Sequence, residues 1–195
     1  SAHVERALAF YLHAQVEAGS LCPVTMTFAA LPVLQREPLY ATLDDKLFSP
    51  NHDPRDLPID AKQSVLIGMG LTEKQGGSDL RGTRTEAVPL DGCGRGATYR
   101  LTGHKWFFSA PMCDAHLVLA STADGLSAFF VPRWRADGRR NPVLLQRLKD
   151  KLGNRSNASA EVEFADAHGT LVGEPGRGIA TLAEMASLTR LDCAI

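Results

Sequence analysis

The sequence predicts an α+β protein of the multi-domain type: a partial helical region, an antiparallel β-barrel or sandwich, and one C-terminal helix. Two changes in the spacing of apolar residues carry this prediction. The spacing is helical over residues 1–68, falls toward two residues from Leu71 onward, and returns to the helical period after Gly178. We therefore predict domains at 1–68, 69–175 and 176–195, of which the second is the β domain.

The composition is that of a globular chain and excludes a strongly basic binding domain. Hydrophobic residues make up 44% and charged residues 22% of the chain, which is enough apolar material for a buried core. The 21 lysines and arginines are balanced by 22 acidic residues, so the charge gives no reason to expect binding to nucleic acid or an anionic membrane. The cysteines and histidines show no disulfide or metal-ligand spacing, which favours a reducing compartment and predicts a cytoplasmic protein.

The N-terminal region begins with two helical patterns. Apolar residues recur at three- and four-residue steps from Val4 to Val16, which is typical of an amphipathic helix that ends near Gly19. Residues 18–35 carry no charge but contain two prolines and several small polar residues. We interpret them as a buried helix broken by prolines and not as a membrane span. Further prolines then divide the chain into turns, at Pro38, Pro50, Pro54 and Pro58.

The middle region contains short runs rich in β-branched and aromatic residues, separated by turn clusters such as Asp124-Gly125 and Asp137-Gly138. Six or more short strands at this spacing are typical of an antiparallel sandwich or barrel. The predicted strands are 98–101, 106–108, 116–120, 126–131, 143–148 and 161–164.

The last segment returns to a helical pattern, with one apolar face. The chain starts within one helix and stops within another, with no stop signal after Ile195, so we interpret it as a fragment of a longer protein. The residues on that face are Ile179, Leu182, Met185, Ala186 and Thr189.

The most unusual segment is residues 69–79, with the sequence MGLTEKQGGSD. Its paired glycines let backbone N–H groups approach a ligand, and Thr72 and Ser78 add hydroxyl donors. Such a loop can hold an anion or the polar edge of a planar ring. It has the spacing of neither a P-loop nor a G-x-G-x-x-G fingerprint, and an ordinary surface turn is an equal alternative.

A second segment, residues 103–111, places three consecutive aromatic residues before a hydroxyl group. These rings can form a wall against a flat cofactor, with the hydroxyl group reaching its edge. An aromatic core strand is the alternative, and it is the commoner outcome for such clusters. The four residues are Trp106, Phe107, Phe108 and Ser109.

Six collinear motifs resemble those of acyl-CoA dehydrogenases. Thr72-Glu73 with Gly77-Ser78-Asp79 resembles the T-E-P-x-x-G-S-D signature of that family. The stretches TEKQGGSD, GHKWFFS and RLKDKLGNRSNAS, and FYLHAQVEAGS near the start, resemble the branch associated with the response to DNA alkylation. The five pieces that follow the signature in order are Thr85-x-Ala87, Tyr99-x-Leu101-x-Gly103-x-Lys105, Lys151-x-Gly153-x-Arg155, Phe164-x-Asp166 and Leu171-x-Gly173-x-x-Gly176-x-Gly178.

This resemblance implies an N-terminal helical domain, a middle β domain and a C-terminal four-helix domain, with FAD bound between the last two. The chain would contain part of the first domain, the complete second and the opening helix of the third. Thr72 and Ser78 would also contact the acyl-CoA substrate. The implied FAD contacts are Met69, Gly70, Leu71, Thr72, Gly76, Gly77, Ser78, Phe107, Phe108 and Ser109.

The family also implies a role for each contact. The threonine matching Thr72 and nearby N–H groups bond the pyrimidine edge of the flavin, where negative charge gathers once hydride reaches N5. Phe107, Phe108 and Ser109 match a W-I-T strand whose aromatic ring flanks the flavin and whose threonine bonds N5. Serine keeps that donor.

Three departures from the family pattern bear on activity. Lys74 replaces the usual proline, and Phe107 replaces the usual tryptophan. The family's catalytic glutamate comes mostly from the C-terminal domain, and in a minority from the helix position that Thr189 occupies here. Because threonine is not a useful base at neutral pH, no catalytic base can be assigned.

The resemblance implies that the intact protein is a homotetrameric, FAD-dependent enzyme that dehydrogenates an acyl thioester between Cα and Cβ. The alternative is a flavin-binding protein of DNA protection and repair whose dehydrogenase chemistry is vestigial. Its DNA contacts would lie in the C-terminal domain. A third interpretation is a β-domain interaction module.

The remaining charged residues have structural interpretations. Glu73 is predicted to be structural because no perturbing partner is evident. His104 and Lys105 are predicted to be solvated, on the strand face opposite part of the aromatic wall. Arg155 is predicted to orient a loop by bonding carbonyl groups. A charged hairpin tip is favoured over a phosphate or DNA site for Arg133, Arg135, Arg139 and Arg140.

Overall fold

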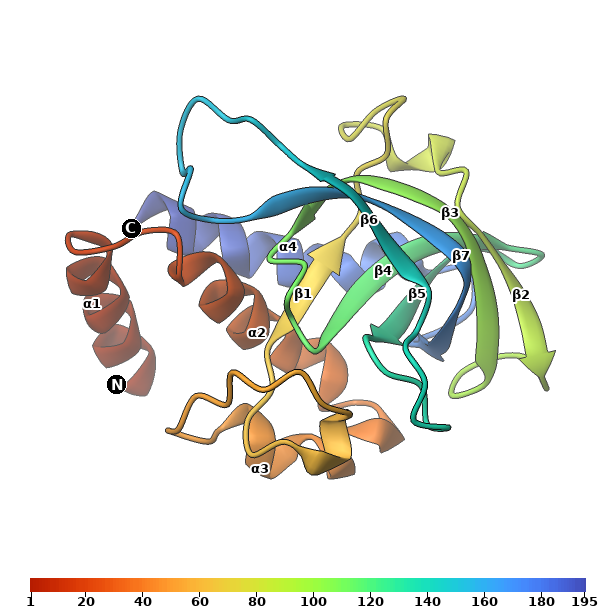
Figure 1. Ribbon diagram of the computed structural model, residues 1–195, viewed down its shortest axis with the longest axis horizontal. Helices are drawn as coiled ribbons and strands as arrows, with labels where there is room; N and C mark the ends of the chain where they lie inside the picture. The colour runs from red at the N-terminus through yellow and green to blue at the C-terminus, as the bar shows by residue number, and fades with distance from the viewer.

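A seven-stranded sheet curls into a barrel, and helices pack against its outside (Figure 1). The computed structural model describes all residues, 1–195. Pairings of β4 with β2, β2 with β3, β3 with β7, β7 with β5 and β5 with β4 close the ring, while β1 joins β4 and β6 joins β7. The strands are β1 Ile67–Gly70, β2 Glu86–Asp91, β3 Thr98–Ser109, β4 Ala115–Thr122, β5 Gly125–Pro132, β6 Val143–Leu148 and β7 Ser159–Val172. The helices are α1 Ala2–Ala14, α2 Leu21–Leu34, α3 Asp44–Leu47 and α4 Gly178–Ala194.

The predicted fold class is confirmed, and all six predicted strands fall within β3 to β7. The first two of them are parts of the single long strand β3. The sequence pattern missed β1 and β2, because β1 is four residues with two glycines and β2 contains Pro89 and buries only Ala87. β1 runs parallel to β4, so the sheet is not purely antiparallel.

The structure corrects one part of the prediction for residues 1–68 and confirms the turns that the prolines after α2 predicted. α2 is not broken, since Pro23 lies in its first turn, where its missing N–H is not needed, and Pro32 lies in its last turn. After α2 the chain forms only short helical turns and loops before β1 begins at Ile67. None of the helices combines the length and apolar character that crossing a membrane requires.

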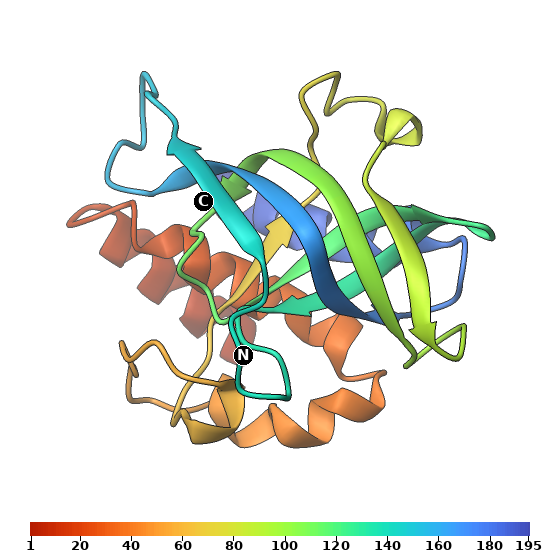
Figure 2. The same cartoon turned by 45° about the vertical axis from the view of Figure 1, so that its right-hand side comes forward.

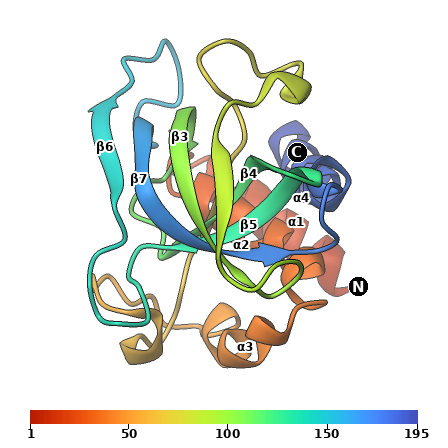
Figure 3. The same ribbon diagram turned by 90° about the vertical axis from the view of Figure 1, so that its right-hand side faces the viewer.

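β4 separates two hydrophobic cores because successive side chains of a strand point to opposite faces. Leu117 and Leu119 point to the core shared with α2 and α4, whereas Val118 and Ala120 point into the barrel. Figure 3 shows β6, β7 and β3 side by side on the side of the barrel away from α4.

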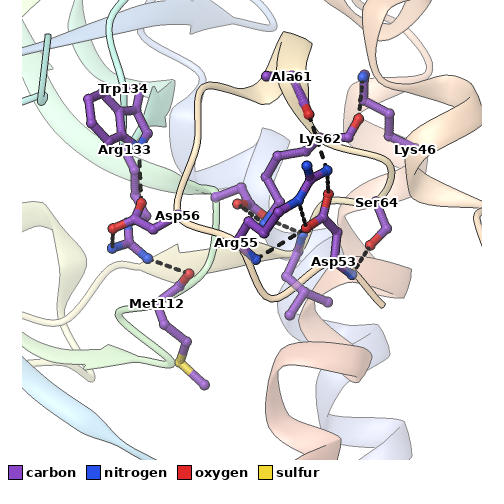
Figure 4. Close-up of polar contacts among 12 residues, drawn as sticks. Lys46, Asp53, Arg55, Asp56, Ala61, Lys62, Ser64, Met112, Arg133 and Trp134 are labelled. Atoms are coloured by element: carbon purple, nitrogen blue, oxygen red, sulfur yellow. Dashed lines mark hydrogen bonds and ion pairs between the residues drawn. The ribbon is translucent and has the colours of Figure 1, made fainter. Parts of the chain in front are cut away.

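Ion pairs tie the segment between α3 and β1 to the barrel (Figure 4). The buried Lys62 Nζ lies 2.7 Å from Asp114 Oδ1. Asp56 accepts hydrogen bonds from Trp134 Nε1 at 2.9 Å and from Arg133 at 3.0 Å, and it also pairs with Arg140. Together with the Arg139–Asp137 pair at 2.9 Å, these contacts confirm a charged hairpin tip.

A buried ion pair joins the loop after β1 to β3, and it overturns the prediction that Lys105 is solvated. Lys105 is fully buried, with Nζ 2.7 Å from Glu73 Oε1. The reason is a β-bulge in β3. Lys105 pairs with Val162 and Phe108 pairs with Ala160, so two residues of β3 oppose one of β7 and the alternation changes phase.

Glu73 is structural, as predicted, but it does have a perturbing partner. Burial alone would raise the pKa of Glu73. Hydrogen bonds from Lys105, the Thr85 hydroxyl and the Arg84 N–H outweigh burial and lower that pKa to about 2. Burial lowers the pKa of Lys105 to about 8, which leaves the amine charged at neutral pH. The half-buried His104 accepts a hydrogen bond from Lys74 N at 3.1 Å.

Replacing Glu73 by Gln leaves a buried ammonium group without a counter-charge. We expect the free energy of unfolding at neutral pH to fall by about 3 kcal/mol, as it does when one partner of a buried pair is removed. The double variant Glu73→Gln/Lys105→Met should recover part of that loss. Urea denaturation of the three proteins measures these differences.

The same proteins test the pH dependence. The pKa of folded Glu73 lies below its ordinary value of 4.5, so its contribution to stability is present above pH 4.5 and is lost as the pH falls toward 2. The stability difference between wild type and the double variant should shrink over this interval. A difference that stays constant would contradict the pair's role.

Candidate functional site

A cavity of about 460 Å³ opens where the end of β1, the end of β3 and one face of α4 meet. Thr72 and Gly77 line it from the loop after β1, and Phe107 and Ser109 line it from β3. Leu182 lies on its α4 side. The cavity thus brings together the two segments that the sequence singled out, although they are far apart along the chain.

Contacts with β3 hold the loop after β1 at the edge of the cavity. The carbonyl group of Thr72 accepts a hydrogen bond from Trp106 N at 2.8 Å, and Glu73 binds Lys105 from the neighbouring position. Gly77 packs directly on Thr72, because a Cβ atom at Gly77 would lie 2.7 Å from Thr72 Cγ2 and 2.9 Å from Oγ1. The loop therefore needs glycine at this position to keep the Thr72 side chain in place.

The bulge in β3 directs Phe107 and Ser109 into the cavity. Phe107 is 47% exposed, and Lys149 Nζ lies 4.5 Å from the centre of its ring. Phe108 does not belong to this wall, because it points into the barrel and its ring stacks on His116 with centroids 3.7 Å apart. Among the aromatic residues of this strand, Phe107 alone lines the cavity. The sequence pattern predicted a wall of three rings, and the family resemblance implied contacts from Phe107 and Phe108.

The other predicted contact residues divide between the cavity and its surroundings. Met69 and Leu71 line the cavity. Gly70 lies behind it, where a Cβ atom would meet the Phe108 ring at 2.7 Å. Gly76 and Ser78 are exposed and lie outside the lining.

The spacing of apolar residues did not show that α4 lines the cavity, although the family resemblance implied a site between the β domain and the C-terminal domain. The spacing identified the helical face of Leu182, Ala186 and Thr189 but not what that face covers. The periodicity of a helix reports that one face is buried, while the surface that this face packs against depends on the three-dimensional fold.

Polar residues of α4 also line the cavity, among them Thr189 and Arg190. The Thr189 hydroxyl donates to the carbonyl group of Ala186 at 2.9 Å, so it is bonded within its own helix. Arg190 is the charged residue of the lining.

Two family models match the chain. Residues 68–167 match the acyl-CoA dehydrogenase middle domain, and residues 1–54 match the adaptive response protein AidB N-terminal domain. The chain is 58% identical over its whole length to the Escherichia coli protein AidB, of which it covers 36%. It is 35% identical over 89% of its length to acyl-CoA dehydrogenase family member 11 of Caenorhabditis elegans, of which it covers 29%. The chain thus spans about a third of the length of these curated relatives.

Solved structures agree with these matches. Caenorhabditis elegans ACDH-11 in complex with C11-CoA superposes with a TM-score of 0.74 at 34% identity, over 89% of this chain and 30% of that one. A Bacillus anthracis acyl-CoA dehydrogenase complexed with FAD superposes with a TM-score of 0.57 at 25% identity, over 66% of this chain and 21% of that one. The motif resemblance is confirmed, and the chain belongs to the acyl-CoA dehydrogenase family.

Proposed function

We propose that the protein is an FAD-dependent flavoprotein that oxidises the Cα–Cβ bond of an acyl thioester, and that the cavity holds its isoalloxazine ring. The observation that carries this proposal is the convergence of two hydroxyl groups, on Thr72 and Ser109, beside the exposed ring of Phe107. The relatives that bind FAD and C11-CoA support the choice of cofactor and substrate class.

The lining has the chemistry that such a ring requires. Met69, Leu71 and Phe107 offer apolar surface to the flat face of the ring, and the two hydroxyl groups can bond its polar edge. The N–H groups of Thr72 and Gly77 donate no hydrogen bond within the chain and are free to bond a ligand. A flavin fits this donor set, since it combines a planar apolar body with a polar rim.

The flavin, when bound, supplies hydride acceptance at N5, and the residues of this chain bind and orient it. The hydroxyl groups of Thr72 and Ser109 hold the polar rim, where fixed donors stabilise negative charge. Phe107 and Leu182 would cover the bound ring with apolar surface, from β3 and from α4. Glu73 is not a base for the substrate, because its carboxylate binds Lys105 and Thr85 and its pKa is about 2. The lining of the cavity holds no carboxylate and no histidine, so no residue there can be assigned as the base for proton abstraction.

The full-length protein tests this proposal in two steps. First, the purified protein should carry FAD, seen as flavin absorbance. Second, anaerobic addition of acyl-CoA thioesters of increasing chain length should bleach that absorbance. Absence of flavin would refute the proposed site. Bound flavin that no acyl-CoA reduces would refute the dehydrogenase activity alone and would favour the DNA-protection alternative.

A matched pair of glycine variants tests the geometry of the loop. We expect Gly77→Ala in the full-length protein to weaken FAD binding about tenfold, because the new methyl group displaces the Thr72 hydroxyl. Gly76→Ala is the control, since a Cβ atom there meets nothing within 4 Å. Fluorescence quenching of FAD measures both dissociation constants. Equal constants for the two variants would exclude Thr72 from the site.

Ser109 provides a second test. Ser109→Ala removes the hydroxyl group and should weaken FAD binding about fivefold, the value of one ordinary hydrogen bond. Ser109→Thr keeps the donor and should bind FAD as well as wild type does. The visible flavin spectrum should shift in the alanine variant only. A threonine variant that behaves like the alanine variant would show that packing, and not the hydroxyl group, is what matters.

A further inference from the structure

Lys151 is a half-buried cation without a carboxylate partner. Its ammonium group donates to the carbonyl group of Asn157 at 2.6 Å and to Ser159 Oγ at 3.1 Å, and it forms no ion pair. The two buried lysines of the chain are neutralised, Lys105 by Glu73 and Lys62 by Asp114. The positive charge of Lys151 is therefore uncompensated in its immediate surroundings.

This charge lies on the same face of the sheet as Ser109, next to the neighbouring strand β7. Ser159 is the direct cross-strand partner of Ser109. Directly opposite residues point to the same face, with Cβ atoms about 5 Å apart. Because Lys151 Nζ bonds Ser159 Oγ, the ammonium group lies within roughly 10 Å of the Ser109 hydroxyl.

The loop between β6 and β7 holds Lys151 in this position. Arg155 Nε donates to the carbonyl group of Lys151 at 2.8 Å, which confirms that Arg155 orients a loop. Ser156 Oγ donates to Glu17 at 2.6 Å, which fixes the loop against the turn between α1 and α2; Figure 2 shows the two segments next to each other. Glu17 also accepts from the N–H groups of Gly19 and Ser20, so its carboxylate is bonded away from Lys151.

A thiol group connects the same region to α2. Burial raises the pKa of the Cys22 thiol, and the neighbouring Ser109 and Asn157 side chains oppose that shift. Lys151, Asn157, Cys22 and Ser109 thus form one polar cluster, and its ammonium group is the source of net charge. Neither the sequence motif nor the proposed function assigns a role to Lys151.

We propose that Lys151 is a positioning residue that places a fixed positive charge behind Ser109 to favour negative charge on the flavin rim. This inference rests on the proposed function, because it presupposes flavin in the cavity. A rim bonded to the Ser109 hydroxyl would lie up to about 13 Å from this charge. At that distance in a partly buried site, a unit charge changes the relative stability of two charge states by about tenfold. Lys151 should therefore raise the ratio of the affinities for reduced and oxidised FAD by about that factor.

The test measures the dissociation constants of oxidised and reduced FAD in full-length variants. Lys151→Gln removes the charge but keeps an amide donor, and Lys151→Arg keeps the charge. We expect the glutamine variant to lower the affinity ratio about tenfold, equivalent to a two-electron potential about 30 mV lower. The arginine variant should restore most of the wild-type ratio. Lys151→Met is a second neutral variant in case the first folds poorly.

Lys46 offers a matched control. It is another half-buried lysine without a carboxylate partner, and it donates to the carbonyl groups of Asp60 and Lys62, away from the cavity. Lys46→Gln should leave the affinity ratio unchanged. A Lys151→Gln protein that binds FAD with the wild-type ratio would overturn this inference and leave the proposed function standing. A wild-type protein that binds no FAD would overturn both.

Discussion

The buried pair between Glu73 and Lys105 is the interaction on which the geometry of the site depends. Glu73 accepts hydrogen bonds from Lys105 Nζ, the Thr85 hydroxyl and the N–H groups of Arg84 and Thr85. The pair therefore joins the loop after β1, the start of β2 and the middle of β3. Both charges are removed from water, so separating them would leave each unpaired in a low-dielectric interior. This cost fixes the loop that carries Thr72 against the strand that carries Ser109.

The bulge in β3 makes this arrangement possible. A strand with regular alternation that points Lys105 into the barrel would also point Phe107 and Ser109 inward. The extra residue between Lys105 and Phe108 reverses the alternation, so Phe107 and Ser109 face the cavity while Lys105 and Phe108 stay inside. One strand thus supplies the buried anchor and the exposed ligand surface within five residues, from Lys105 to Ser109.

Local patterns in the sequence predicted the elements that local forces determine. The runs in β3 to β7, the helix after Gly178 and the loop from Thr72 to Ser78 were visible because their residue types and periods are characteristic. The burial of Lys105 was not visible, since it depends on a bulge and on a carboxylate more than thirty residues away. The strand β1 was missed for a similar reason, because its glycines lie against His116 and Phe108 and carry no pattern of their own. The part of the cavity lining that α4 supplies and the polar cluster around Lys151 likewise depend on contacts between distant segments.

The distribution of buried charge indicates which part of the chemistry this chain can supply. Every buried carboxylate has a cation beside it: Glu37 has Arg95, Asp53 has Arg55, Glu73 has Lys105, Asp114 has Lys62 and Asp192 has Arg6. A carboxylate bonded in such a pair is held in place, so it is a poor candidate to move toward a substrate proton. Lys151 is the opposite case, a cation left without a carboxylate near the cavity. Under the proposed function, these residues are suited to stabilise negative charge on a bound ring, and none of the five paired carboxylates lines the cavity.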